Sequence, residues 1–284
     1  MERSVKHIIQ ALDTRDGAGV RLKRSLGQSP HSRLDPFLML DEFASDSASD
    51  YIAGFPNHPH RGFETVTYML EGHMLHEDHM GNRGDLRSGD VQWMTAGRGI
   101  IHSEMPQQES GRMHGFQLWI NLPAREKMKA ASYRDIPAAH MPWVELAGGT
   151  RAKVIAGELH TPDAAEAVQR GPIQGLSTQP LYVDLHVPTH TAQALRLPAQ
   201  HNAVVYVYQG TLWVDGIKVE GGQAAVLTAG TQLTLRSGAE PAQALVLAGR
   251  PLGEPVVQYG PFVMNTVEEI NQALQDYRDG RLAG

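Results

Sequence analysis

Residues 65–72 of this 284-residue chain read TVTYMLEG, an alternating run of β-branched, aromatic and polar side chains that stops at Gly72. Alternation of this kind predicts a β-strand, and the glycine predicts a tight turn after it. A second run of the same design, YVYQG, occupies residues 206–210. The two runs indicate that one strand-and-turn unit is used in both halves of the chain.

A second pair of matching segments supports this repeat. Gly89 is followed after five residues by TAG at residues 95–97, and Gly222 is followed after five residues by TAG at residues 228–230. Because both matches occur in the same order, we predict two copies of one β unit and an all-β fold. Further strands are predicted at residues 91–94, 115–120, 181–185, 203–208, 212–214 and 245–247, with a hairpin turn at 215–216.

One segment near the C-terminus is predicted to be helical. Thr266 followed by Glu269 forms a capping-box pattern, and Gly280 ends the segment. Four apolar residues share one face of it: Ile270, Ala273, Leu274 and Tyr277. Residues 124–143 are richer in charge, alanine and proline and are predicted to connect the two β units. The predicted domains are therefore 1–130 and 131–284, with the short helix in the second.

The composition excludes several classes of protein. No apolar run approaches the roughly 20 residues of a membrane span, and residues 1–17 carry charges where a signal peptide would be apolar. A net charge of −6 argues against non-specific nucleic-acid binding. We therefore expect a cytoplasmic protein, and we expect a monomer. Because the chain has no cysteine, any bound metal must sit on histidine and carboxylate ligands.

Half of the 14 histidines fall between residues 58 and 114. A single histidine is more often a surface residue than a ligand, but His58 and His60 are spaced i, i+2, which places both on one side of a strand. His102 and Glu104 have the same spacing. Two such pairs on facing strands would give three imidazoles and one carboxylate, a set that suits Fe(II) and similar divalent ions. The remaining histidines of the polar stretch before Gly81 are predicted to be loop residues: His73, His76 and His79.

The chain resembles the pirin family of bicupins nearly from end to end, although its middle is more divergent. The longest matching motifs are HPHRGFETVTY at residues 58–68 and QWMTAGRGIIHSEMP at residues 92–106. Shorter ones are LDPF at 34–37, DEF at 41–43, EPVV at 254–257 and GPFVMNT at 260–266. The resemblance implies two cupin barrels, each a double-stranded β-helix or jelly roll, with the helix following them.

The resemblance also implies one metal, usually iron, in the N-terminal cupin. The family's three histidines and one glutamate fall on His58, His60, His102 and Glu104. The broader cupin pattern would instead nominate Glu64; we follow the closer family and expect a structural role for Glu64. Fe(II) is the expected ion, with Ni, Mn, Co, Cu or Zn as alternatives. Aligning the two halves places weak or unsuitable ligands in the second cupin, which is expected to be metal-free: Arg196, Pro198, Leu235 and Ser237.

Because pirin-like proteins include quercetinases, the resemblance implies a quercetin 2,3- or 2,4-dioxygenase that opens a flavonol with oxygen and releases carbon monoxide. Glu104 would take the proton of the substrate hydroxyl, and Met94, Phe116 and Trp119 are candidates to line the barrel. Two alternatives stay open. One is a non-enzymatic, iron-binding regulator whose partners are transcription factors or metabolic enzyme complexes. The other is a metal-dependent isomerase or hydrolase.

Overall fold

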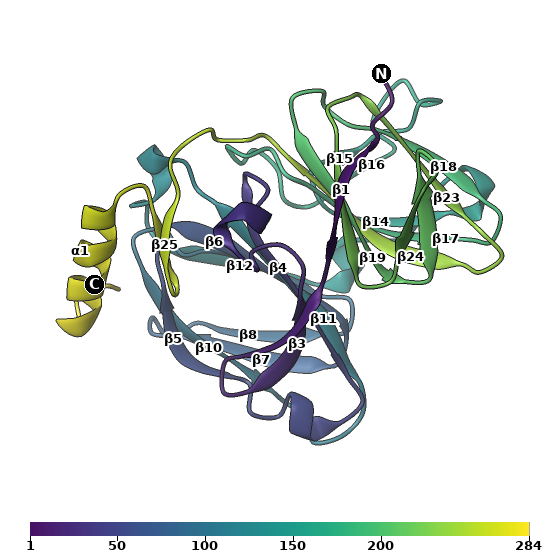
Figure 1. The fold of residues 1–284 in the computed structure, drawn as a ribbon. Helices are drawn as coiled ribbons and strands as arrows, with labels where there is room; N and C mark the ends of the chain where they lie inside the picture. Colours follow the sequence, from purple (N-terminus) through teal and green to yellow (C-terminus); the bar gives the residue numbers. More distant parts are fainter. Residues whose placement is uncertain (284) are drawn as a thin grey trace. The chain divides into compact units, whose positions relative to one another are not determined.

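The computed structural model describes residues 1–283, which form two compact units that are both discontinuous in sequence (Figure 1). The N-terminal barrel consists of residues 13–24 and 37–138, together with the segment that begins at Leu252. The C-terminal barrel consists of residues 1–12, 25–36 and 139–251. Each unit is a pair of β-sheets, so the predicted all-β fold of two cupin barrels is confirmed.

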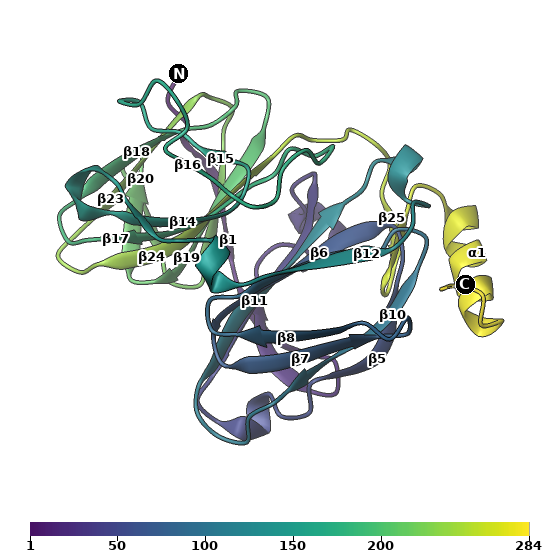
Figure 2. The ribbon, with the colours of Figure 1, turned by 180° about the vertical axis from the view of Figure 1, so that it is seen from behind.

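The N-terminal barrel has a seven-stranded sheet in the order β12-β9-β6-β11-β4-β3-β2 and a four-stranded sheet in the order β5-β10-β7-β8. Figure 2 shows the smaller sheet below strands β6 and β11 of the larger one. The strands are β2 (Leu12–Asp16), β3 (Val20–Arg24), β4 (Phe37–Ser45), β5 (Phe55–His60), β6 (Phe63–Glu71), β7 (His73–Asp78), β8 (Arg83–Arg87), β9 (Val91–Thr95), β10 (Ile100–Pro106), β11 (Met113–Asn121) and β12 (Ser132–Ile136).

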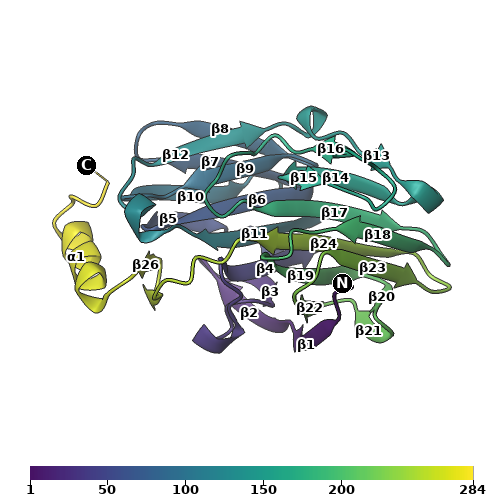
Figure 3. The same cartoon turned by 90° about the horizontal axis from the view of Figure 1, so that it is seen from above.

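The C-terminal barrel repeats this plan, with a seven-stranded sheet β1-β22-β19-β24-β17-β14-β13 and a four-stranded sheet β18-β23-β20-β21 (Figure 3). Its strands are β1 (Val5–Gln10), β13 (Val144–Glu145), β14 (Arg151–Ala156), β17 (Leu181–Val187), β18 (Ala192–Arg196), β19 (Asn202–Gln209), β20 (Thr211–Val214), β21 (Ile217–Glu220), β22 (Gln223–Leu227), β23 (Gln232–Ser237) and β24 (Ala242–Gly249), with a separate pair β15 (Glu158–Leu159) and β16 (Gln169–Arg170). Leucine, valine and alanine side chains from both sheets fill its interior.

The predicted repeat is confirmed by the topology. The two runs that suggested it lie in β6 and β19, which occupy the same position in their sheets. Strand β6 lies between β9 and β11, and β19 lies between β22 and β24. The hairpin turn between β20 and β21 is also confirmed. Asp215 and Gly216 have φ of 48° and 76°, the left-handed pair that a two-residue turn matching the twist of the strands requires.

The compact units differ from the predicted domains in four places, the first being residues 25–36, which belong to the C-terminal barrel. Strand β1 pairs with β22 and so completes the sheet of the C-terminal barrel. Strand β12 lies in the stretch that was predicted to be a connection, but it pairs with β9 as the edge of the N-terminal sheet. The hairpin of β25 (Val257–Tyr259) and β26 (Phe262–Met264) and the helix α1 (Val267–Arg278) belong to the N-terminal barrel. In each case long-range pairing or packing decides the placement, and the local sequence does not carry that information.

Helix α1 begins where the capping box predicts. The Thr266 hydroxyl accepts a hydrogen bond from the backbone N–H of Glu269, and the carboxylate of Glu269 accepts one from the backbone N–H of Thr266. Its apolar face, with Ile270 and Ala273, packs on Phe262 of strand β26. Among the described residues, no helix is both long enough and apolar enough to cross a membrane.

Candidate metal centre

Three imidazoles converge on the inner face of the four-stranded sheet. Strands β5 and β10 run antiparallel with His102 directly opposite His58 and with Ile100 opposite His60. The i, i+2 spacing turns His60 to the same face, and one ring nitrogen from each of the three histidines lies within 4.8 Å of the others. The sequence prediction that His58, His60 and His102 meet is therefore realised in the structure.

The nitrogens that converge are suited to hold a metal ion. The Nδ1 atom of His58 lies 2.8 Å from the Pro56 carbonyl oxygen, which leaves its Nε2 facing Nε2 of His60 at 3.0 Å. Nε2 of His102 is buried and has no hydrogen-bond partner. A buried nitrogen without a partner is costly unless a ligand completes it. Three such imidazoles could hold a divalent metal ion.

Burial also keeps two of these rings neutral. It lowers the pKa of His60 and of His102 well below the ordinary value of 6.5, and the neighbouring histidines lower both pKa values further. A neutral imidazole offers the lone pair that a metal requires, whereas a protonated one does not.

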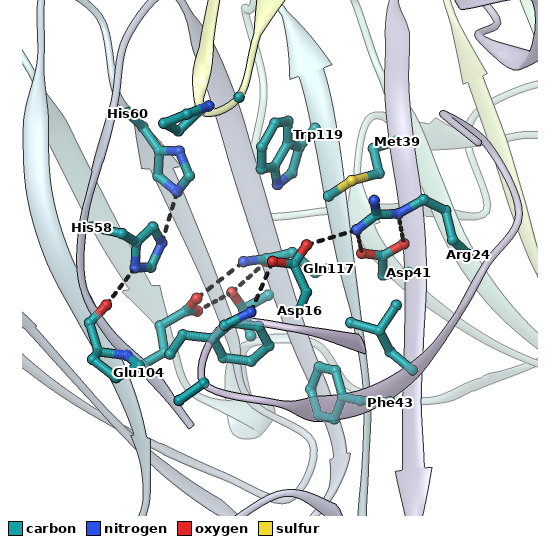
Figure 4. Close-up of a pocket in the computed structure, with 18 of the residues that line it drawn as sticks. Asp16, Arg24, Met39, Asp41, Phe43, His58, His60, Glu104, Gln117 and Trp119 are labelled. Carbon is teal, nitrogen blue, oxygen red and sulfur yellow. Dashed lines mark hydrogen bonds and ion pairs between the residues drawn. The ribbon is translucent and has the colours of Figure 1, made fainter. Parts of the chain in front are cut away.

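Glu104 lies beside this cluster and does not join it. Its carboxylate is buried and accepts hydrogen bonds from Thr67 Oγ1 at 2.9 Å and from Gln117 Nε2 at 3.1 Å (Figure 4). The register between β10 and β5 shifts between His102 and Glu104, but the extra residue lies on β5, and β10 pairs regularly with β7, so Glu104 stays on the same face of β10 as His102. Glu104 lines the same cavity as His58 and His60, but its roles as a ligand and as a base remain predictions.

Glu64 points away from the histidines. It is three residues from Thr67 on β6, so the two side chains project from opposite faces of the strand. Its carboxylate accepts a hydrogen bond from Thr95 Oγ1 at 2.6 Å and lies 3.8 Å from Lys129 Nζ. This placement agrees with the structural role expected for Glu64.

The prediction of a loop for the other histidines is wrong for two of them. His73 and His76 lie in strand β7, whereas His79 lies in the turn after it. His76 is 1% exposed, and its Nδ1 atom lies 3.3 Å from Nδ1 of His102. The reading of this stretch as polar concealed a strand in which Met74 and His76 face inward on alternate positions.

His58 and His60 line a cavity of about 680 Å³. Figure 4 shows His58 and His60 on one side and Arg24 and Asp41 on the other. The apolar part of the lining comes mainly from Leu22, Met39, Phe43, Phe55, Met74 and Trp119. Trp119 thus lines the cavity as expected, whereas Met94 and Phe116 are fully buried in the protein core and are absent from the lining.

A charged network closes the far side of the cavity. Arg24 donates two hydrogen bonds to Asp41, at 2.8 and 2.7 Å, and one to Asp16 at 2.8 Å. Burial raises the pKa of Asp41 to about 6 although the Arg24 guanidinium opposes this change. The cavity is therefore apolar along most of its length and polar at both ends.

Comparison with known proteins shows the family of this chain. The sequence profile named Pirin matches residues 19–120, and the profile of the pirin C-terminal cupin domain matches residues 182–283. The chain belongs to the pirin family. A Pseudomonas aeruginosa protein provisionally named quercetin 2,3-dioxygenase is 56% identical to it over 271 residues, which is 94% of each chain. A pirin-like protein of Caulobacter vibrioides is 47% identical and covers 98% of this chain and 99% of its own.

A solved structure extends the likeness to the whole pirin fold. The crystal structure of a quercetin 2,3-dioxygenase from Acinetobacter baumannii superposes with a TM-score of 0.91 at 32% identity, covering 100% of this chain and 99% of that one. These comparisons establish a pirin-like cupin protein.

The metal should be lost as the pH falls, because protons compete with it for the histidine nitrogens. Because the pKa of His60 and of His102 is lowered, protons compete for their nitrogens only below the ordinary 6.5. We expect the metal to survive dialysis at about pH 6 and to be lost progressively as the pH falls further. Metal analysis after dialysis tests this, with circular dichroism to confirm that the fold persists. Complete loss at about pH 6.5, or full retention at about pH 4, would contradict a three-imidazole site.

Metal analysis should also give about one ion per chain. Among the described residues, no group of three histidine or carboxylate ligands of this kind occurs in the C-terminal barrel. Leu235, one of the residues aligned with the N-terminal ligands, is fully buried in the apolar core there. Inductively coupled plasma mass spectrometry of the purified protein measures the ratio. A second ion that remains after replacement of His58 and His102 by alanine would overturn this prediction.

Proposed function

We propose that this protein is a metal-dependent dioxygenase that opens a flavonol such as quercetin and releases carbon monoxide. The observation that carries the proposal is the cluster of three imidazoles, two of which line, together with the buried carboxylate of Glu104, a largely apolar cavity of about 680 Å³. Cavities that bind small aromatic molecules commonly have volumes of about 300–1,000 Å³. The provisional name of the Pseudomonas relative and the name of the Acinetobacter structure support the same reaction class.

His58, His60 and His102 would hold the ion, with Glu104 as a fourth ligand, and Fe(II) is the ion that we expect. When bound, such an ion supplies Lewis acidity that lowers the pKa of a coordinated hydroxyl, and it supplies one-electron chemistry with oxygen. The ligand set leaves positions for the substrate and for oxygen, as open non-haem iron sites do.

The protein's own side chains bind and orient the substrate. Trp119, Met39 and Phe43 offer the apolar contacts that a planar aromatic molecule requires, and they exclude water from one side of the histidines. Glu104 would accept the proton of the substrate hydroxyl. Thr67 and Gln117 hold its carboxylate in position by the hydrogen bonds that they donate.

An aerobic assay with quercetin tests the proposal. The iron-loaded protein should consume oxygen and release carbon monoxide in equal amounts while the absorbance of the flavonol falls, and the metal-free protein should do neither. Fully loaded protein that consumes no oxygen with quercetin or a related flavonol would refute the dioxygenase proposal. It would favour the non-enzymatic regulator instead.

A further inference from the structure

His76 and His102 form a buried imidazole pair at the edge of the metal centre. Strand β7 runs beside β10, with His76 opposite Glu104 in the register. The two rings lie 4.8 Å apart between centroids, their Nδ1 atoms are 3.3 Å apart, and each side chain is 1% exposed. The pair is thus a direct contact between a proposed metal ligand and a residue outside the ligand cluster.

The contact assigns the protons of both rings. In a hydrogen bond between two neutral imidazoles, one nitrogen donates and the other accepts. Nε2 of His102 is buried without a protein partner, and if it is the nitrogen that binds the ion, it must keep its lone pair free. Nδ1 of His102 therefore carries the hydrogen and donates it to Nδ1 of His76. His76 is then an acceptor at Nδ1 and carries its own hydrogen on Nε2, which is buried and has no hydrogen-bond partner, so this tautomer has a cost that the bond to His102 must offset.

Metal-bound histidines almost always donate their second N–H to a carboxylate, a carbonyl or water, which fixes the ring and raises its basicity as a ligand. His58 follows this rule, because its Nδ1 faces the Pro56 carbonyl oxygen at 2.8 Å. For His102 the acceptor is a second neutral imidazole. The ring of Tyr133, from strand β12, packs on His76 with centroids 5.5 Å apart and holds that acceptor in place.

We propose that His76 is the positioning residue of the metal centre, which orients His102 and fixes its tautomer by accepting the Nδ1–H hydrogen bond. This inference rests on the proposed metal site and adds a residue that the ligand motif does not contain. A neutral imidazole is a weaker acceptor than a carboxylate, so it raises the basicity of His102 less than an aspartate in its place would.

Two variants separate the hydrogen bond from simple packing. His76→Asn keeps an acceptor near the position of Nδ1, whereas His76→Leu has a comparable size and no acceptor. His73→Leu is the matched control, because His73 lies on the same strand, projects from its other face and contacts Asp85 instead. Co(II) is the probe, since its visible absorption reports both the affinity and the geometry of the site.

We expect His76→Leu to weaken Co(II) binding by about tenfold to a hundredfold and to change the Co(II) spectrum. His76→Asn should stay within about threefold of the unmodified protein, and His73→Leu should match it. Unchanged binding in His76→Leu would overturn the proposal. Equal losses in the leucine and asparagine variants would overturn it too, because packing alone would then explain them.

Nuclear magnetic resonance of the unmodified protein gives a test that does not depend on a variant folding. In the zinc-loaded, ¹⁵N-labelled protein, His76 should be the neutral tautomer with its hydrogen on Nε2, and His102 should carry its hydrogen on Nδ1. A hydrogen on Nδ1 of His76 would refute the assignment. Neither test needs turnover, so an absence of dioxygenase activity would leave the proposal for His76 intact. A failure of the unmodified protein to bind Co(II) would refute the metal centre itself.

Discussion

Replacing His102 by alanine is expected to lower the affinity for divalent metal by more than about a hundredfold. Loss of an outer partner of a metal-bound histidine costs about ten- to a hundredfold, and loss of the ligand itself should cost more. Nε2 of His102 is buried with no other partner, and no other described histidine belongs to the cluster except His58 and His60. Titration of the metal-free protein with Co(II) against a competing chelator measures the change.

The matched control for this variant is His79→Ala. His79 lies in the turn after strand β7, and its Nε2 atom contacts the carbonyl oxygen of Ala283, outside the cluster. The His79→Ala variant should bind Co(II) as tightly as the unmodified protein does. If His102→Ala kept its affinity, or if His79→Ala lost as much, the assignment of the three imidazoles would be wrong.

Replacing Glu104 by glutamine should reduce quercetin turnover by at least about a hundredfold, the lower end of what a general base contributes. The amide has nearly the same shape but cannot take a proton. It is also a poorer ligand than a carboxylate, so the metal should bind at least about tenfold more weakly, which is about 1.4 kcal/mol. Steady-state assays at saturating metal separate the loss of catalysis from the loss of the ion.

Glu64→Gln provides the comparison, because Glu64 is also a buried carboxylate. It lies on the face of β6 opposite to Thr67, the residue that donates a hydrogen bond to Glu104. Burial raises the pKa of Glu64, and its contacts are to Thr95 and Lys129. This variant should keep its metal and most of its activity. The reverse result, with Glu64→Gln inactive and Glu104→Gln active, would transfer the catalytic role to the carboxylate of the broader cupin pattern.

The parts of the site that the sequence predicts are those determined by local spacing. An i, i+2 pair in a strand projects to one face whatever the rest of the chain does, so His58 and His60 could be paired from their positions alone. The repeat of strand, turn and glycine predicted two copies of one β unit, and the family resemblance implied that each copy is a cupin barrel. The capping box fixed the start of α1, because Thr266 and Glu269 bond to each other's backbone within one turn.

The parts of the fold and of the site that the sequence does not predict depend on which strands become neighbours. His76 stands in a polar stretch, and only the pairing of β7 with β10 brings it to His102. Strand β1 was not predicted. Helix α1 was, but the pattern of an amphipathic helix does not show which barrel the helix packs on. The hydrogen bonds that Glu104 accepts from Thr67 and Gln117 likewise depend on the neighbouring strands, which the spacing of the motif does not contain.

The most direct measurement of the central claim is the rate of carbon monoxide release from quercetin as metal-free protein is titrated with Fe(II) under controlled oxygen. The three-imidazole centre predicts a rate that starts at zero, rises in proportion to the iron bound and stops rising at about one ion per chain. In the His102→Ala variant the rate should stay near zero over the same range. A rate that does not depend on iron, or no carbon monoxide from protein that holds one iron per chain, would contradict the account.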